Sequence, residues 1–172
     1  ALLRLPDYGS VHDLIHTALR HDAVVMNPTY RGQRHSDTPF QAQYPGLLTA
    51  GLEHPDTYIM RQVFVDALRA VEALRQQTLA EVHSIALTGA GLGGALALAT
   101  AAHCPGLRAV AADTPLALGH PATLTGNPAY PLAELHDYLR LYPERREQVL
   151  AGTAPLNLLP LAAQMTVPVL LS

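Results

Sequence analysis

The sequence is poor in several residue types, and each scarcity excludes a class of protein. Tryptophan is absent, and the 172 residues include only two phenylalanines and a single cysteine, Cys104. One cysteine excludes an internal disulfide framework and favours a reducing, cytoplasmic compartment. Charged residues make up 15% of the chain and the net charge is −3, which excludes a disordered, highly charged chain. No apolar run reaches the roughly 18 residues of a membrane-spanning helix. We expect neither nucleic acid nor a membrane as a partner.

What the chain does contain is apolar sequence in a regular alternation. Hydrophobic residues are 49% of the total, which is enough for the core of one domain. Short apolar runs alternate with segments of helical periodicity, a pattern typical of a parallel sheet wrapped by helices. The predicted strands are residues 2–5, 22–27, 83–88, 108–113 and 167–171. The predicted helices are residues 11–20, 57–77, 92–103, 131–141, 143–151 and 156–164.

The sequence pattern of two of these helices predicts how they pack. Helix 57–77, for which Asp56 is a candidate N-cap, has one apolar stripe that we expect to face the sheet. The stripe consists of Ile59, Val63, Ala67, Ala70, Val71 and Leu74. Helix 92–103 is apolar nearly all round and is predicted to be buried. Residues 28–56 are predicted to be a long loop, and residues 114–166 a helical, cap-like insertion over the strand ends.

The two ends of the sequence indicate a shortened domain. The chain begins at Ala1 and enters an apolar run at once, and residues 167–171 look like a buried strand at the other end. Because further chain normally covers a sheet edge, we expect a single domain truncated at both ends. Strands 22–27 and 167–171 would then be open edges, and we expect a homodimer or larger assembly to cover at least one of them.

A glycine-rich turn between strand 83–88 and helix 92–103 fits two functional patterns. Gly89, Gly91 and Gly94 match the dinucleotide fingerprint G-x-G-x-x-G. Asp113, at the end of the next strand, stands near the expected position of a ribose-binding carboxylate. The fingerprint usually opens its domain, however, and some 80 residues precede it here. The pattern therefore supports a dinucleotide site only weakly.

The same turn also fits the nucleophile elbow G-x-S-x-G of the α/β-hydrolases, with glycine in place of the serine. Gly89 and Gly93 occupy the two flanking small positions, and Gly91 stands at the centre. A central glycine adopts the positive φ of an elbow without strain, but it has no oxygen with which to form an acyl-enzyme. The turn predicts either a cofactor-binding domain or a hydrolase elbow without its nucleophile.

Other segments favour the hydrolase. They are Tyr30-Arg31-Gly32-Gln33 with Ser36 behind it, the helix segment 61–72, Leu87-Thr88-Gly89, Ala112-Asp113-Thr114-Pro115, and the segments 128–134 and 167–172. On these residues, taken in order, the chain resembles the acetyl xylan esterase and cephalosporin-C deacetylase family over nearly its whole length. Arg-Gly-Gln and the Val-Phe-Val-Asp-Ala run of the helix are the most specific parts of the resemblance.

The resemblance implies an α/β fold, a doubly wound five-stranded parallel sheet with the strands in the order 2-1-3-4-5. It also implies a Ser-His-Asp hydrolase of acetylated sugars or similar small esters that needs no cofactor. The family's serine falls on Gly91, and its oxyanion-hole N–H groups fall on Tyr30 and Leu92. The family's Asp and His would follow Ser172. The resemblance thus implies an esterase-like chain that is inactive as it stands.

Two alternatives to an inactive esterase remain open. One is a dinucleotide-binding domain that uses Gly89, Gly91, Gly94 and Asp113. The other is a non-catalytic acetyl-sugar-binding or scaffold protein. Arg31 likewise has two interpretations, because it is either a substrate clamp or a structural anchor for its own loop.

The histidines offer a weaker lead toward a metal. His12 and His16 have the i, i+4 spacing of a zinc-binding helix, with Asp13 in place of the usual glutamate. Because no third ligand is evident, we interpret them as surface residues and expect no metal site. His35, beside the Arg-Gly-Gln segment, and His120, after the strand that ends at Asp113, are two further candidates for the pocket, and we interpret both as solvated loop residues.

Overall fold

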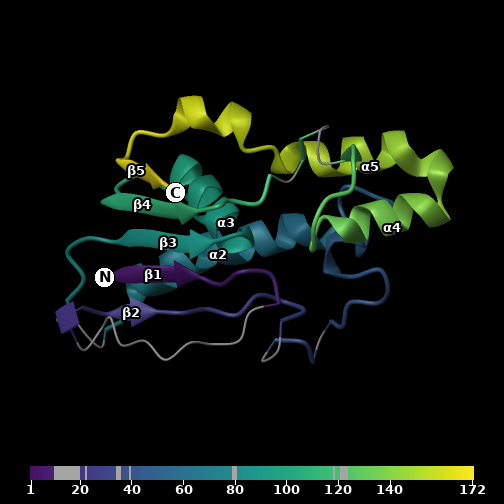
Figure 1. The fold of residues 1–172 in the computed structure, drawn as a ribbon. Helices are drawn as coiled ribbons and strands as arrows, with labels where there is room; N and C mark the ends of the chain where they lie inside the picture. The colour runs from purple at the N-terminus through teal and green to yellow at the C-terminus, as the bar shows by residue number, and fades with distance from the viewer. Residues whose placement is uncertain are drawn as a thin grey trace.

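A five-stranded parallel sheet forms the centre of the computed structural model, which describes residues 1–9, 20–21, 23–33, 36–38, 40–78, 81–117, 119–120 and 124–172. The strands are β1 (Leu2–Leu5), β2 (Val25–Met26), β3 (Ala86–Ala90), β4 (Ala109–Asp113) and β5 (Val169–Leu171). They lie in the order β2-β1-β3-β4-β5 (Figure 1). The predicted fold class and strand order are confirmed. The helix expected over residues 11–20 lies almost wholly outside the described residues.

The register of the sheet brings the turns after β1 and β3 together. Leu3 pairs with Leu87, and Leu87 in turn pairs with Val110, which places three buried side chains in one row across the sheet. Two positions further along, Leu5 pairs with Gly89. Because all strands are parallel, their carboxyl ends meet at one edge of the sheet, where such folds usually place their ligand sites. The glycine turn after β3 therefore lies beside the segment that follows β1.

Helices α2 (Ile59–Gln76) and α3 (Leu92–His103) pack against the sheet and against each other (Figure 1). Every member of the predicted apolar stripe of α2 is buried, and Met60 joins it. Helix α3 is buried over its first ten residues, as its apolar sequence predicts. These two helices bury the apolar surface that would otherwise leave the central strands exposed to water.

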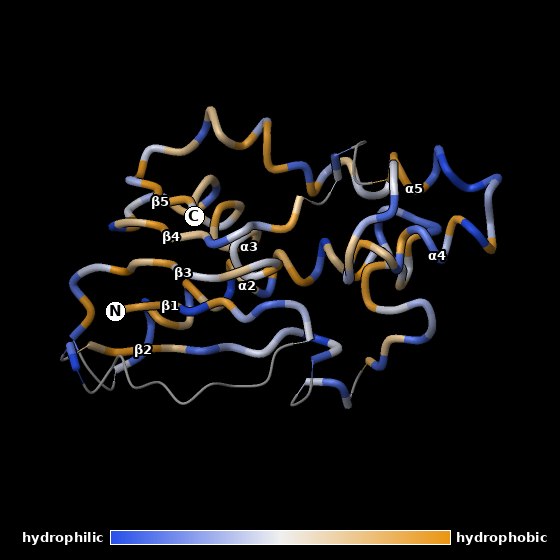
Figure 2. Tube along the Cα trace, viewed as in Figure 1, coloured by the Kyte–Doolittle hydropathy of each residue, from blue (hydrophilic) through white to orange (hydrophobic). Residues whose placement is uncertain are grey.

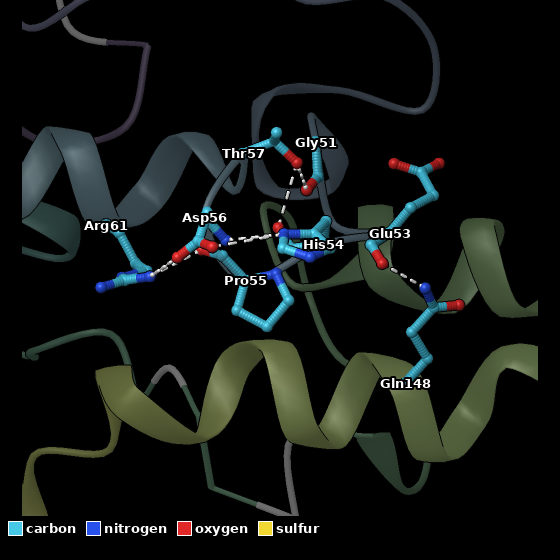
Figure 3. A network of polar contacts seen from close by, with 8 residues as sticks. All are labelled: Gly51, Glu53, His54, Pro55, Asp56, Thr57, Arg61 and Gln148. Atoms are coloured by element: carbon cyan, nitrogen blue, oxygen red, sulfur yellow. Dashed lines mark hydrogen bonds and ion pairs between the residues drawn. The ribbon is translucent and has the colours of Figure 1, made fainter.

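The start of α2 differs from the prediction that Asp56 caps it. The helix begins at Ile59, its N-cap is Tyr58, and no side chain caps it. Asp56 instead accepts a hydrogen bond from Arg61 Nη1 at 3.1 Å, while Thr57 Oγ1 donates to the Gly51 carbonyl at 2.9 Å (Figure 3). The turn before the helix is thus held by its own polar contacts. Figure 3 also shows Gln148, from the neighbouring helix, donating to the Glu53 carbonyl.

The segment predicted as a long loop, residues 28–56, contributes to the core. It contains a short 3-10 helix, η1 (Leu47–Thr49). Leu47, Leu48 and Leu52 are all buried there. These apolar side chains pack the segment against the core of the domain, although it contains several prolines.

The segment between β4 and β5 is helical, as predicted. Its elements are α4 (Ala133–Leu141), η3 (Pro143–Arg145), α5 (Arg146–Thr153), η4 (Ala154–Leu156) and η5 (Leu159–Gln164). The helix predicted over 156–164 is a 3-10 helix, with a proline in its first turn. Helices α4 and α5 lie beyond the carboxyl ends of the strands, and Figure 2 shows hydrophilic residues gathered around the turn between them. That this segment acts as a cap stays a prediction.

The outer strand β5 is more exposed than a buried strand would be. Leu170 is 67% exposed and Leu171 is 62% exposed, which agrees with the prediction of an open edge at residues 167–171. Both lie at the sheet edge, on the strand that pairs with β4. In the described part of the chain, no helix is both long enough and apolar enough to cross a membrane. The expected homo-oligomer stays a prediction.

Candidate active site

The glycine turn between β3 and α3 has the backbone of an elbow. Gly91 has φ +52° and ψ −119°, a conformation that residues with a Cβ rarely adopt. Its N–H donates to the Asp113 carbonyl at 3.0 Å, and its carbonyl accepts from the Leu116 N–H at 2.9 Å. The segment after β4 therefore holds the turn in place. Asp113 contributes to this through its backbone, and its side chain accepts a hydrogen bond from Ser172 Oγ at 3.2 Å.

The flanking glycines allow the strands and the helix to approach closely. A Cβ built on Gly93 would lie 2.8 Å from the Pro6 carbonyl oxygen and 2.9 Å from the Leu5 carbonyl carbon. A Cβ on Gly89 would lie 2.9 Å from the Gly93 Cα. Real side chains do not approach the backbone so closely, so both positions need glycine. This is the role that small residues have on either side of a nucleophile elbow.

Two backbone N–H groups converge at the start of α3, and a carboxylate lies between them. The N–H of Tyr8 donates to Asp7 Oδ1 at 2.7 Å, and the N–H of Leu92 donates to the same oxygen at 2.8 Å. A Cβ on Gly91 would lie 2.6 Å from Asp7 Cγ. The Asp7 carboxylate thus occupies the space in which a side chain at position 91 would begin. The sequence interpretation missed Asp7, although the pairing of Leu5 with Gly89 places it level with Gly91.

The structure places the two predicted oxyanion-hole donors differently. Leu92 lies at the start of α3, where its N–H converges with that of Tyr8. The role of Tyr30 and Leu92 as a donor pair stays a prediction. The Tyr30 N–H instead donates to Gln33 Oε1 at 3.1 Å. Tyr30 is 1% exposed, and burial raises the pKa of its hydroxyl well above the ordinary value. Tyr30 is therefore a core residue of the loop.

The Arg31-Gly32-Gln33 segment anchors the loop that surrounds the site. Arg31 makes a bidentate ion pair with Asp66 on α2, with Nε to Oδ2 and Nη2 to Oδ1 both at 2.6 Å. Gly32 N–H donates to the Ser36 carbonyl at 3.0 Å. Gln33 Nε2 donates to the Asp7 carbonyl at 2.9 Å, which ties this loop to the segment after β1. Of the two interpretations of Arg31, the structural anchor is the one that these contacts favour.

A buried glutamate that the sequence interpretation missed fixes the ring of Tyr8. The Tyr8 hydroxyl donates to the Glu134 carboxylate at 2.7 Å and accepts from the Leu47 N–H at 2.8 Å. Glu134 also accepts from the Leu48 N–H at 3.0 Å. Burial raises the pKa of Glu134, and the hydrogen bonds from Tyr8 and Leu48 oppose that rise. The contact joins α4 to the segment around η1. Glu134 closes the segment 128–134, which contributes to the family resemblance, but nothing in that segment predicts its contact with Tyr8.

The arrangement argues against a dinucleotide at the glycine turn. A pyrophosphate would bind at the N-terminus of α3, where the Asp7 carboxylate already takes up the Leu92 N–H. Two anions in one such position would repel each other. A helix N-terminus occupied by a carboxylate is therefore unsuited to a second, phosphate anion.

The remaining candidates lie away from the turn or outside the described residues. His12, His16 and His35 lie outside them. His120 lines a cavity of about 670 Å³ beside β5. Within the described residues, no group of three His, Cys, Asp or Glu side chains is placed to hold a metal ion. Cys104 is half-buried, and burial raises the pKa of its thiol.

The sheet order, the left-handed Gly91 and the two converging N–H groups together define the chain as an α/β-hydrolase in fold. A family model described as acetyl xylan esterase (AXE1) matches residues 6–172. The chain therefore belongs to the acetyl xylan esterase family, as the sequence resemblance predicts.

Solved structures agree with this assignment of the fold. The acetyl xylan esterase of Paenibacillus sp. R4 superposes with a TM-score of 0.80 at 23% identity, and that of Thermoanaerobacterium sp. JW/SL YS485 with 0.83 at 24%. Each match covers 99% of this chain and 57% of the other, so the chain spans little more than half of either esterase. An acylaminoacyl peptidase from Pyrococcus horikoshii shares the fold at a TM-score of 0.64 and 15% identity.

Proposed function

We propose that this chain is a member of the acetyl xylan esterase family that does not hydrolyse esters through an acyl-enzyme at its elbow. The observation that carries the proposal is Gly91, which has the elbow backbone but offers no side-chain oxygen as a nucleophile. This argument concerns position 91 alone and is independent of any residue that follows Ser172. An acetylated sugar or a similar small ester is the proposed ligand class, by analogy with the family.

Ester hydrolysis and acyl-enzyme formation test this proposal directly. The purified chain is mixed with 4-nitrophenyl acetate, the release of nitrophenolate is followed, and the intact protein mass is measured at early times. We expect the rate of buffer and no mass increase of one acetyl group. A saturable rate well above buffer would contradict the proposal. Acetylation of a residue outside the glycine turn, located by peptide mapping and without a rate above buffer, would be a stoichiometric side reaction and would leave the proposal standing.

A non-catalytic acetyl-sugar-binding protein is the second candidate, and one cavity favours it. A cavity of about 470 Å³ beside η1 has Tyr44, Tyr138, Tyr142 and Glu53 among its lining residues, and Arg145 lies 4.4 Å from the centre of the Tyr142 ring. Aromatic faces with a few polar groups suit a ligand that is apolar on one face and hydroxylated at its rim. Calorimetric titration with acetylated xylo-oligosaccharides tests this. Tyr142→Ala should weaken saturable binding, and Leu159→Ala, at an exposed position outside this cavity, is the control.

We also propose that the chain forms a homo-oligomer, and the exposed edge strand β5 supports this proposal. Leu170 and Leu171 present apolar side chains at the sheet edge, which proteins usually cover. Sedimentation velocity over a hundredfold range of concentration tests the proposal. A sedimentation coefficient that stays at the monomer value throughout would contradict it.

A further inference from the structure

The Asp7 carboxylate has the position and contacts of a bound anion. Its Oδ1 receives the N–H groups of Tyr8 and Leu92 at 2.7 and 2.8 Å. Donors at such distances are those that hold an oxyanion in hydrolases. One donor is the first residue of α3, where the helix dipole adds a favourable field for negative charge. The hole therefore contains an anion that the chain itself supplies.

The chain holds this carboxylate from several sides. Gln33 Nε2 donates to the Asp7 carbonyl at 2.9 Å, which fixes the backbone from which the side chain projects. The neighbouring Tyr8 is fixed through its hydroxyl on Glu134 at 2.7 Å. The absence of a Cβ at Gly91 leaves the space that the carboxylate fills, because such a Cβ would lie 2.8 Å from Asp7 Oδ2. The occupied state is thus built into the packing around the turn.

We propose that Asp7 is an internal ligand of the oxyanion hole and that it excludes small carboxylates and ester oxygens from the two N–H groups. Asp7 and Gly91 form a matched pair, since a side chain at position 91 requires the Asp7 carboxylate to leave. Removing the Asp7 side chain opens a site for a small carboxylate such as acetate. This inference rests on the proposed function only where it identifies the N–H groups of Tyr8 and Leu92 as an oxyanion hole. It is tested by measuring binding, not hydrolysis.

An NMR titration with sodium acetate tests the exclusion. The amide signals of Tyr8 and Leu92 are followed in the wild type and in the Asp7→Ala, Asp7→Asn and Asp56→Ala variants. We expect saturable shifts in Asp7→Ala, with acetate binding at least tenfold tighter than in the wild type. Asp7→Asn should stay closed, because its amide oxygen accepts from the same two N–H groups. Asp56→Ala removes a charge from an exposed side chain and should behave as the wild type.

Three outcomes of this titration would overturn the proposal. The first is a wild type that binds acetate at these two amides as tightly as Asp7→Ala does. The second is a folded Asp7→Ala in which neither amide responds. The third is an Asp7→Asn that binds as tightly as Asp7→Ala, since charge repulsion rather than occupancy would then explain the exclusion. None of these outcomes depends on whether the chain hydrolyses an ester, so the two proposals fail separately.

Two further measurements test the proposal without acetate, and the first of them uses the wild type alone, so it holds even if Asp7→Ala does not fold. Hydrogen exchange in the wild type should show the Leu92 amide protected. The first amide of a helix has no partner within the helix, so this protection would come from its hydrogen bond to Asp7. Rapid exchange of that amide would overturn the occupied hole. Gly91→Ser should lower the melting temperature, and adding Asp7→Gly should recover part of the loss. Strictly additive effects of the two substitutions would overturn the matched pair.

Discussion

The glycine turn at 89–94 and the Arg31-Gly32-Gln33 loop meet at the same site, yet they build it in opposite ways. The loop uses its own side chains, with Arg31 on Asp66 and Gln33 on the Asp7 carbonyl. The turn contributes backbone and space, and its one charged group comes from Asp7, 85 residues away along the chain. Both motifs are recognisable from the sequence. What fills the space that the glycines leave is not recognisable, because packing decides it.

The largest loss of stability should come from substituting Gly93, which lies against backbone, and a smaller one from substituting Gly91, which lies against a side chain. Gly93→Ala places a Cβ 2.8 Å from the Pro6 carbonyl oxygen and still closer to the Leu5 carbonyl oxygen, so backbone must move. We expect a loss of about 4 kcal/mol in the free energy of unfolding. Gly91→Ala meets the Asp7 side chain rather than backbone, and its cost of about 1–3 kcal/mol combines the positive φ with the displacement of that carboxylate. Urea denaturation of both variants measures the difference.

A control for the positive φ of Gly91 is available at Gly126. Gly126 also has a positive φ, and a Cβ there would meet no atom within 4 Å. Gly126→Ala therefore reports the cost of the backbone conformation alone. If Gly93→Ala costs no more than Gly126→Ala, the close approach of α3 to β1 is not what makes Gly93 necessary.

Much of the fold follows from the sequence because its signals are local and repeated. The apolar runs predict all five strands, and the stripe from Ile59 to Leu74 predicts the buried face of α2. Ends of elements are less predictable. Strand β2 is Val25–Met26, within a predicted strand of six residues. Helix α2 begins at Ile59, although Asp56 is a residue type that often caps helices. Contacts of the preceding turn, such as Thr57 to the Gly51 carbonyl, decide where that helix begins.

The sequence predicts the site residues whose position depends on their own local backbone. It does not predict those that reach the site through contacts with residues far away in the chain. Gly91 and Leu92 have the positions that the elbow pattern gives them. Asp7 carries no motif, and only the register of β1 against β3 brings it to the turn. Glu134 is likewise brought to Tyr8 from a helix 126 residues away. The predicted donor Tyr30 lies beside Arg31 in the sequence, whereas the N–H that converges with that of Leu92 in the structure belongs to Tyr8.

The next effect tests the side-chain motif. Arg31→Lys keeps the charge but loses the two-pronged pairing with Asp66, whose side chain is 19% exposed. We expect a loss of about 2 kcal/mol in the free energy of unfolding. Arg61→Lys is the matched control, because its pair with Asp56 lies in the open and should contribute about 0.5 kcal/mol or less. Equal losses in the two variants would show that the Arg31 pair does not anchor the loop.

A smaller, pH-dependent effect tests the glutamate that fixes Tyr8. Burial raises the pKa of Glu134, so the folded state holds the proton more tightly than the unfolded state does. The stability that this proton supplies is fully present below the ordinary carboxyl pKa and is lost as pH rises through the raised one. The stability of the wild type relative to Glu134→Gln should therefore fall as pH rises, by at most about 1.4 kcal/mol per pH unit.

Urea denaturation of both proteins from pH 4 to pH 7 measures this difference. Glu147→Gln removes the same charge from an exposed position on α5 and serves as the control. A difference between wild type and Glu134→Gln that rises with pH over this range would have the wrong sign. Glu134 would then be stabilised in its ionised form by Tyr8 and Leu48 more than it is destabilised by burial.

The smallest effect concerns two buried tyrosines that differ in one hydrogen bond. Among the described residues, the Tyr30 hydroxyl is buried without a hydrogen-bond partner, whereas the Tyr58 hydroxyl donates to the Leu48 carbonyl at 3.0 Å. An unsatisfied buried hydroxyl is costly, and removing it removes the cost. Tyr30→Phe should therefore leave the free energy of unfolding unchanged or raise it by up to about 1 kcal/mol. Tyr58→Phe should lower it by about 1 kcal/mol. A clear loss in Tyr30→Phe would mean that the loop depends on the Tyr30 hydroxyl as well as on the side chains of Arg31 and Gln33.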